Sequence, residues 1–299
     1  MYTYRAFGLN IASEYELEEL VACQCESPEL MITIGKVPDT FEDMLLDRAN
    51  RKIGKDKFLL NLPKIAKYYV EKGRHIMIEP LETATLEEIK LYLLGSCMGA
   101  VLYQRRILPL HGSCINIGGQ GVLLTGVSGA GKSTIASAIY QKGYKMLTDD
   151  VAAVGIEGFS EPTVFPGYPG QKLWEDAIER IGRQEDKKYL NRISNDIAKY
   201  SMRSNHYFYD KELPIKYIFE IVQDTTEQLM LEEVKGNNKL KLLIKNTYRP
   251  MLARTMLLQE WNFMQCARIA SQIRAYRVIR PQGQHLEDRI ADLILEKVK

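Results

Sequence analysis

A glycine-rich segment, GVLLTGVSGAGKST, constrains the fold of this chain more than any other feature. It contains the spacing Gly-x-x-x-x-Gly-Lys-Ser, from Gly126 to Ser133, directly after the apolar run 122–125. Glycines allow backbone turns that are closed to other residues, so successive amide N–H groups can point at phosphate oxygens while the next helix presents its positive end. The segment therefore predicts a strand, a phosphate-binding loop and a helix, in that order.

The loop residues have separate predicted roles. Lys132 would add a positive charge beside the β- and γ-phosphates, and Ser133 would offer its hydroxyl to Mg²⁺. We therefore expect ATP and Mg²⁺ as cofactors, with GTP left open by the sequence. A glycine-rich turn that matches by chance is disfavoured by the flanking strand and helix patterns and by the lack of proline. The predicted nucleotide contacts are Gly126, Ser128, Gly129, Ala130, Gly131, Lys132, Ser133 and Thr134.

Two consecutive acidic residues follow the next predicted strand. The helix after the loop should end near Gly143, and the strand 144–148 leads into Asp149 and Asp150. In a βαβ unit the carboxyl ends of both strands lie at one edge of the sheet, so the aspartates should emerge beside the loop. One carboxylate can hold the metal ion, and the other can accept the proton of a hydroxyl being phosphorylated. A solvated turn or a helix cap is the plainer alternative.

A histidine precedes the loop by one strand. The apolar run that starts at His111 is joined by the turn sequence GGQG to the strand of the loop, which predicts a hairpin. A turn centred on Gly119 and Gln120 would place His111 opposite Ser128. A lone histidine is usually a surface or core residue, but this register favours a catalytic role near the γ-phosphate. There it could orient Asp149 or donate to a phosphate oxygen.

The pattern divides the chain into two regions. Residues 1–85 read as short extended stretches separated by turns, which predicts a small, mainly β N-terminal domain. Residues 86–299 predict an α/β catalytic domain with a mixed sheet and flanking helices, entered through a helix over 85–104. The expected N-terminal strands are 3–11, 30–36, 57–62 and 74–79.

The later part of the second region is less regular. We expect a strand over 215–222, a strand pair joined at 236–238, a helix over 250–275 and a terminal amphipathic helix. Residues 180–206 show a weak helical pattern that fits either a substrate lid or a plain charged helix.

Composition excludes several function classes. Forty basic and 38 acidic residues leave a net charge of +2, without the basic excess typical of nucleic-acid binders. The longest apolar run, 91–103, is broken by glycines and is shorter than the roughly 20 residues that span a membrane. The opening MYTYRAFG lacks a basic segment followed by an apolar one, so we expect no secretory signal and a cytoplasmic protein. A homo-oligomer stays open.

His111 with Gly112, the glycine loop, and Asp149 with Asp150 resemble the core of the HPr kinase/phosphorylase family, bacterial enzymes that phosphorylate a serine on a carrier protein. The resemblance covers about residues 108–155 and implies a P-loop kinase core of the HPr kinase type. It also implies that Asp149 is the general base, that Asp150 is a metal ligand and that His111 stabilises the reacting centre. The family's glycine-containing signature after the aspartates is replaced here by PTVFPGYPGQKLW.

Over its whole length the chain looks similar to an offshoot of that family, the kinases encoded with lasso peptides, on the opening YRAFGLNIAS and the segment PGYPGQKLW. That similarity implies a peptide or protein partner with a serine acceptor, namely the C-terminal serine of a lasso peptide precursor. A kinase of an HPr-like carrier or a small metabolite is one alternative, and a nucleotide-binding regulator with little transfer activity is another. Additional cations for transfer would come from Lys172, Arg192, Arg203 or Arg249.

Overall fold

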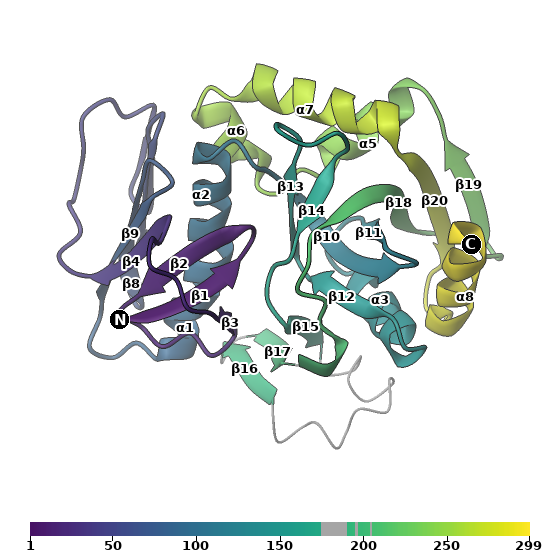
Figure 1. Ribbon diagram of the computed structural model, residues 1–299, viewed down its shortest axis with the longest axis horizontal. Helices are drawn as coiled ribbons and strands as arrows, with labels where there is room; N and C mark the ends of the chain where they lie inside the picture. The colour runs from purple at the N-terminus through teal and green to yellow at the C-terminus, as the bar shows by residue number, and fades with distance from the viewer. Residues whose placement is uncertain (175–189, 195–196, 204) are drawn as a thin grey trace.

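The computed structural model describes residues 1–174, 190–194, 197–203 and 205–299, and for residues 172–203 it describes the backbone alone. The chain has a mixed α/β architecture with two large mixed sheets and helices packed around them (Figure 1). Helix α2 (Met98–Gln104) lies between the sheets and contacts strands of both. The predicted boundary at residue 85 stays a prediction.

The N-terminal sheet has nine strands in the order β3-β1-β2-β4-β9-β8-β7-β6-β5. The predicted run 3–11 forms a hairpin rather than one strand, because Phe7 and Gly8 take positive φ angles of 56° and 77° and turn the chain back. The strands are β1 (Tyr2–Ala6), β2 (Leu9–Ser13), β3 (Val21–Ala22), β4 (Leu30–Ile34), β5 (Leu46–Arg48), β6 (Arg51–Ile53), β7 (Lys57–Leu62), β8 (Ala66–Glu71) and β9 (His75–Pro80).

The helix predicted over 85–104 is confirmed, with one irregular turn. Thr85 begins it with a capping box that includes Glu88, which satisfies backbone donors of the first turn. Helix α1 (Leu86–Tyr92) continues through a π-helical turn (Leu93–Cys97) into α2, and the buried side chains of this region share a hydrophobic core with the N-terminal sheet.

The second sheet has eight strands, and its path closes on itself. The order is β11-β10-β13-β14-β18-β20-β19, β12 pairs with β10, and β11 also pairs in parallel with β18. A smaller sheet has the order β15-β17-β16. The bounds are β10 (Leu108–Ile117), β11 (Gln120–Thr125), β12 (Lys145–Thr148), β13 (Val151–Gly155), β14 (Thr163–Phe165), β15 (Gly170–Trp174), β16 (Leu190–Ser194), β17 (Ile197–Arg203), β18 (Leu213–Asp224), β19 (Met230–Val234) and β20 (Arg274–Pro281).

Helices cover both faces of the second sheet. Strand β11 alternates its side chains, so Leu123 enters the core beneath α5 and α7 while Val122 and Leu124 enter the core beneath α3 and α8. Figure 1 shows α7 along one side and α3 with α8 on another. The bounds are α3 (Lys132–Gln141), α5 (Asn237–Lys245), α6 (Pro250–Thr255), α7 (Gln259–Gln272) and α8 (Glu287–Val298), with a 3₁₀ turn at Asn205–Tyr207.

Two expectations for the later part of the chain were wrong, and the weak helical pattern of a third is contradicted only where the chain is described. The strand pair joined at 236–238 is a strand followed by a helix, because Gly236 precedes α5, which buries Leu242 and Leu243 on one face. The helix over 250–275 is broken by Leu257 at a φ of 58° and ends at residue 272. The described parts of 180–206 contain strands β16 and β17, and the remainder lies outside the described residues.

The tip of the first hairpin joins the N-terminal sheet to the second sheet. The Phe7 amide donates to the Pro166 carbonyl at 2.6 Å, and the Phe7 ring meets Tyr168 edge-on at 6.0 Å. A Cβ on Gly8 would lie 2.8 Å from the Phe165 ring, so only glycine fits there. In the described part of the chain, no helix has both the length and the apolar character that crossing a membrane requires.

Candidate active site

The predicted phosphate loop connects the end of β11 to the start of α3. Its glycines have positive φ angles, 140° at Gly126, 83° at Gly129 and 98° at Gly131, which residues with a Cβ rarely adopt. A Cβ on Gly126 would also lie 2.4 Å from the Ile221 carbonyl oxygen in the neighbouring strand β18. The backbone therefore requires glycine here whatever the loop binds.

Lys132 lies over this loop. Its side chain is buried, and Nζ donates to the carbonyl oxygens of Gly126 at 2.9 Å and Val127 at 3.0 Å. Both acceptors belong to the loop, so the ammonium charge is held at the position where the predicted arrangement needs it for phosphate oxygens.

Asp149 is the buried carboxylate of the site, with 5% of its surface exposed. It accepts hydrogen bonds from two hydroxyl groups: that of Ser113 on β10, and that of Ser133 on α3 at 3.2 and 3.3 Å from its two oxygens. The predicted βαβ unit is confirmed, since β11 and β12 are both antiparallel to the intervening β10 and so run parallel to each other. This arrangement brings Asp149 to the first turn of the helix.

Ser113 was not among the predicted site residues. It follows His111 by two positions on β10, and residues two apart on a strand share a face. The sequence HGSC could therefore have predicted Ser113 as a site residue, because the predicted hairpin already placed His111 near the loop.

Asp150 and His111 form the second half of the site. His111 Nδ1 lies 3.0 Å from the carbonyl oxygen of Asp150 and 3.4 Å from its Oδ1. Asp150 has a φ of 73°, the left-handed region that Asp tolerates better than most residues, and a strained residue there is typical of functional sites. In these contacts His111 pairs with Asp150, and not with Asp149 as one of the sequence alternatives proposed.

The surroundings keep His111 neutral at physiological pH. Burial lowers the pKa of its imidazole below 6.5 and the Lys132 charge lowers it further, against a smaller opposing effect of Asp150. A carbonyl oxygen only accepts, so Nδ1 carries the proton and Nε2 has a free lone pair. The imidazole can therefore accept a proton or a hydrogen bond through Nε2.

The hairpin between β10 and β11 is confirmed, but its register differs from the predicted one. The turn consists of Gly118 and Gly119, at φ angles of 62° and 79°. A two-residue turn of this kind needs positive φ at both positions, which a glycine pair supplies. Extending the observed register by one pair places His111 opposite Gly126 rather than Ser128.

Gln171 braces the helix that follows the loop. It is buried at 3% exposure, accepts from the Ser137 hydroxyl at 2.8 Å and donates to the Ser133 carbonyl at 2.8 Å. Gln171 comes from the segment PGYPGQKLW that distinguished this chain from the family pattern. That segment therefore supports the first turns of α3 from the side.

Of the four additional cations predicted to assist transfer, the structure describes the side chain of one. The side chains of Lys172, Arg192 and Arg203 lie outside the described residues. Arg249 is described, and its guanidinium lies 5.3 Å from the centre of the Tyr248 ring.

Arg280 is a cation beside the loop that the sequence did not suggest. Its side chain is buried, Nη2 donates to the Gln284 carbonyl at 2.6 Å, and Nη1 lies 2.8 Å from the point a Cβ on Gly131 would occupy. A guanidinium this close explains why residue 131 must be small.

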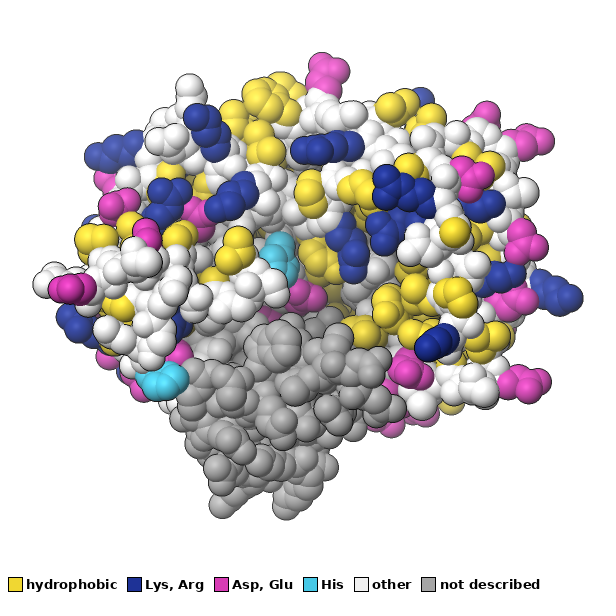
Figure 2. Space-filling view, turned by 180° about the vertical axis from the view of Figure 1, so that it is seen from behind, with side chains coloured by type: hydrophobic (Ala, Val, Ile, Leu, Met, Phe, Trp, Pro, Cys, Tyr) yellow, Lys and Arg dark blue, Asp and Glu magenta, His cyan; other side chains and the backbone are white. Residues whose placement is uncertain are grey.

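The donor set fits Mg²⁺ only together with further oxygens. Among the described residues, no three or more His, Cys, Asp or Glu side chains gather to hold a metal ion by themselves. Ser133 and Asp149 do bring oxygen donors together, and Mg²⁺ is typically held by one or two carboxylates plus substrate phosphates. Figure 2 shows a histidine beside acidic side chains in a recess near the middle of one face, with Lys and Arg side chains gathered near it.

Comparisons with known proteins find one family model and several relatives. Residues 105–166 match the family model of the HPr Serine kinase C-terminal domain. The HPr kinase/phosphorylase of Chlorobaculum tepidum is 43% identical over 63 residues, which cover 21% of this chain and 17% of that protein. The HPr kinase/phosphorylase of Thermoanaerobacter pseudethanolicus is 31% identical over 144 residues, covering 43% of each chain.

These matches span less than half of the relatives' own length. A solved structure, the Hpr(Ser) kinase/phosphatase from Coxiella burnetii, matches at 12% identity and a TM-score of 0.34 over 64% of this chain and 90% of that chain, a score too low to establish a shared fold. The matched segment contains His111, the glycine loop and both aspartates. This segment, residues 105–166, is thus similar to the HPr Serine kinase C-terminal domain.

Proposed function

We propose that this protein is a serine kinase that binds ATP with Mg²⁺ and transfers the γ-phosphoryl group to a serine hydroxyl. The observation that carries the proposal is the meeting of Lys132 and Ser133 with Asp149, Asp150 and His111 at one edge of the second sheet. A generic nucleotide-binding loop needs one carboxylate for the metal ion but neither the second carboxylate nor the histidine. A kinase needs a carboxylate or imidazole that can take the acceptor proton beside the phosphates.

The reaction divides among the residues as follows. The serine oxygen forms a bond to the γ-phosphorus while the bond from that phosphorus to the β–γ bridging oxygen breaks, so ADP leaves. Lys132 and the loop amides stabilise the negative charge that develops on the departing β-phosphate. Mg²⁺, when bound with the nucleotide, screens charge between the β- and γ-phosphates. The serine proton passes to a base of the protein.

Two assignments of the aspartates fit this reaction. The family resemblance supports Asp149 as the base and Asp150 as the metal ligand. The side-chain contacts support the reverse. Ser133, the predicted hydroxyl ligand of Mg²⁺, contacts Asp149, whereas the Asp150 carboxylate lies 3.4 Å from Nδ1 of the neutral His111 imidazole.

Binding of Mn²⁺, measured by electron paramagnetic resonance in the presence of ADP, separates the two assignments. If Asp150 holds the metal, Asp150→Asn weakens Mn²⁺ binding and Asp149→Asn does not. If Asp149 holds the metal, Asp149→Asn weakens Mn²⁺ binding and Asp150→Asn does not. Phosphoryl transfer should fall in both variants under either assignment.

We propose a peptide acceptor, and the overall similarity to lasso peptide kinases supports the C-terminal serine of a lasso peptide precursor. The N-terminal sheet would help to hold that acceptor, since it packs directly against the segment 165–168 next to the site. A carrier protein of the HPr type or a small metabolite is the rival acceptor.

Transfer from radiolabelled ATP tests the function and the acceptor together. The protein would be incubated with Mg²⁺, ATP and a precursor peptide, with and without its terminal serine, and the phosphate located by mass spectrometry. We expect one phosphate on the terminal serine. Transfer to internal residues would reject the terminal acceptor, and ATP binding without transfer to the peptide, an HPr-type carrier or small hydroxyl compounds would favour a nucleotide-binding regulator.

A further inference from the structure

A small cavity of about 200 Å³ lies where the N-terminal sheet meets α6. Phe58, Met251 and Leu252 contribute apolar walls, and Arg51, Ser96 and Arg249 contribute polar groups. Its lining comes from β6 and β7, from the π-helical turn, and from the start of α6.

The charged side chains that line this cavity, Arg51 and Arg249, are both positive. Among the described residues, no carboxylate forms an ion pair with Arg51 or Arg249. Burial lowers the pKa of Arg51, and repulsion from Arg249 and Arg48 lowers it further. By contrast, the buried Glu220 is paired with Lys245 at 3.0 Å and Arg277 at 2.8 Å.

The Arg51 side chain is poorly satisfied in its hydrogen bonding within the described residues. Its Nε is buried and makes no hydrogen bond within the described part of the structure. Its Nη1 reaches the sulfur of Met251 at 3.9 Å, a weak acceptor. A buried guanidinium donor without an acceptor is costly, so the geometry is suited to an anion that supplies one.

The cavity is connected to the candidate active site through one aromatic ring. The Arg249 guanidinium lies 5.3 Å from the centre of the Tyr248 ring, and that ring lies 6.1 Å from the His111 imidazole. Arg249 holds a φ of 48°, a conformation rare for a residue with a long side chain. A molecule bound to Arg249 in the cavity would therefore be separated from His111 by the Tyr248 ring alone.

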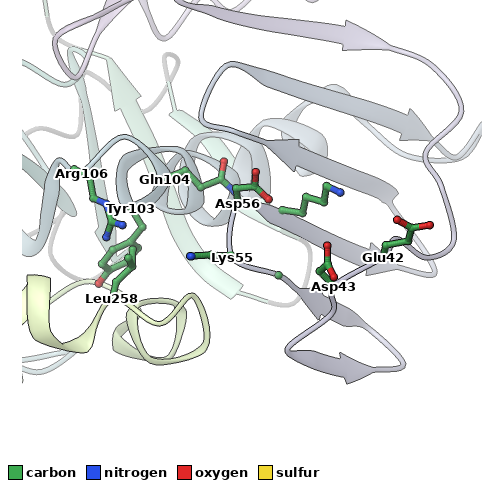
Figure 3. Close-up of a pocket in the computed structure, with 10 residues that line it drawn as sticks. Glu42, Asp43, Lys55, Asp56, Tyr103, Gln104, Arg106 and Leu258 are labelled. Atoms are coloured by element: carbon green, nitrogen blue, oxygen red, sulfur yellow. The ribbon is translucent and has the colours of Figure 1, made fainter.

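A larger cavity nearby makes a useful contrast. Its volume is about 450 Å³, and Figure 3 shows acidic and basic side chains around it, among them Asp43, Lys55, Asp56 and Arg106. Mixed charges of this kind select no single ligand class. The smaller cavity combines two arginines with apolar walls, which fits a carboxylate on a hydrocarbon skeleton better than a free phosphate, since phosphate gains nothing from Phe58 or Leu252.

We propose that the cavity between Arg51 and Arg249 binds a carboxylate group of the acceptor, and so positions the serine beside His111. The proposal rests on the kinase function proposed above. Arg51 and Arg249 are then acceptor-binding residues that neither hold ATP nor transfer the proton.

Small carboxylates test the cavity without requiring transfer. Binding of N-acetyl-alanyl-alanine and of its carboxamide would be followed by saturation-transfer NMR in the wild type, in Arg51→Met and Arg51→Lys, and in Arg48→Met. Arg48 pairs with Arg51 across β5 and β6 but does not line the cavity, so it is the matched control. N-acetyl-aspartic acid α-amide, whose only carboxylate is on the side chain, distinguishes a side-chain carboxylate from a C-terminal one.

We expect the free carboxylate to bind at least about tenfold more tightly than the carboxamide, and Arg51→Met to remove that preference while Arg48→Met keeps it. If Arg51→Lys keeps part of the preference for the carboxylate, the positive charge of residue 51 contributes to binding independently of the guanidinium shape. Equal binding of carboxylate and carboxamide, an unchanged preference in Arg51→Met, or no binding at millimolar concentration would overturn the proposal.

Transfer to N-acetyl-alanyl-serine completes the test. With a carboxylate site, Arg51→Met should raise KM for this acceptor by about tenfold and leave the affinity for ATP unchanged. Carboxylate binding without transfer to any serine acceptor would reject the proposed kinase and keep the cavity. If transfer depends neither on Arg51 nor on the acceptor carboxylate, the proposed carboxylate site is rejected and the proposed kinase function stands.

Discussion

The phosphate-loop region and the Arg51–Arg249 cavity differ in how far their charged side chains are compensated by neighbouring groups. In the loop region Lys132 is hydrogen-bonded to loop carbonyls and Asp149 to two hydroxyls. Arg51 and Arg249 both line the cavity, and Arg51 lacks an acceptor for Nε within the described part of the chain. The charges of Lys132 and Asp149 are thus compensated before any ligand arrives, whereas the charge of Arg51 is not. The buried Nε of Arg280, beside the loop, likewise makes no hydrogen bond within the described part of the chain.

This difference separates two ways of preparing a binding site. Preformed hydrogen bonds hold the loop region in one geometry, and a ligand must exchange them for its own contacts. An uncompensated charge costs stability in the empty protein, and a ligand of opposite charge removes that cost when it binds. The first arrangement favours accurate positioning, and the second favours selection by charge.

The largest expected effect is on the loop side. Asp149→Asn should lower the rate of phosphoryl transfer about a thousandfold, because under either assignment the variant loses a carboxylate that the reaction needs. Single-turnover transfer to the peptide measures it. Ser113→Ala is the matched control, since it removes one hydrogen bond to the same carboxylate and should cost about tenfold. Equal losses in the two variants would contradict a catalytic role for Asp149.

Lys132→Met should weaken ATP binding about a hundredfold, because the loop loses its buried positive charge. Calorimetric titration with ATP and Mg²⁺ gives the dissociation constant. Lys142→Met, at the other end of the same helix and paired with the exposed Asp292, should change it less than about twofold. A similar loss in both variants would mean that Lys132 acts through the stability of α3 rather than through phosphate.

The cavity makes the opposite prediction for stability. Arg51→Met should raise the free energy of unfolding by about 1 kcal/mol, since it removes a like charge and an unsatisfied donor from a half-buried place. Urea unfolding without ligand measures this change. Destabilisation of similar size would show that Arg51 is satisfied in the empty protein and would remove the contrast between the two regions.

The smallest expected effect is a pH dependence at His111. Its pKa in the folded protein lies below 6.5, so between that lowered value and 6.5 the unfolded chain binds more protons than the folded one. Stability should therefore decline as pH falls below about 6.5, and His111→Gln should flatten that decline. Thermal unfolding of both proteins from about pH 7.5 to 5.5 tests the sign, which a raised pKa would reverse.

Sequence reasoning succeeded where the determinants are local. The strand, glycine loop and helix around Lys132 follow from one contiguous segment, and the place of Asp149 follows from the handed, parallel geometry of a βαβ unit. The hairpin turn lies one residue earlier than predicted, which shifts the partner of each strand residue by two positions, because Gly119 and Gln120 looked as suitable as the glycine pair that forms the turn. The helix after Gly236 was missed because a short apolar run fits a strand and a helix equally well.

The remaining site residues depend on contacts between distant segments. Gln171 reaches Ser133 and Ser137 only after the chain has crossed α3 and three further strands, and Arg280 reaches the loop from β20. Arg51 and Arg249 stand nearly two hundred positions apart and meet only where the two sheets join. No spacing rule within one segment predicts such pairs.

The hairpin tip at Phe7 and Gly8 affects the design of truncated or chimeric proteins. The tip contacts Phe165 and Pro166, a few residues before Gln171. A protein cut at residue 85 would therefore lose these contacts beside the candidate active site together with the N-terminal sheet. A shortened protein is thus a poor control for substrate binding. Chimeras with related kinases should exchange the tip and residues 165–171 as one unit.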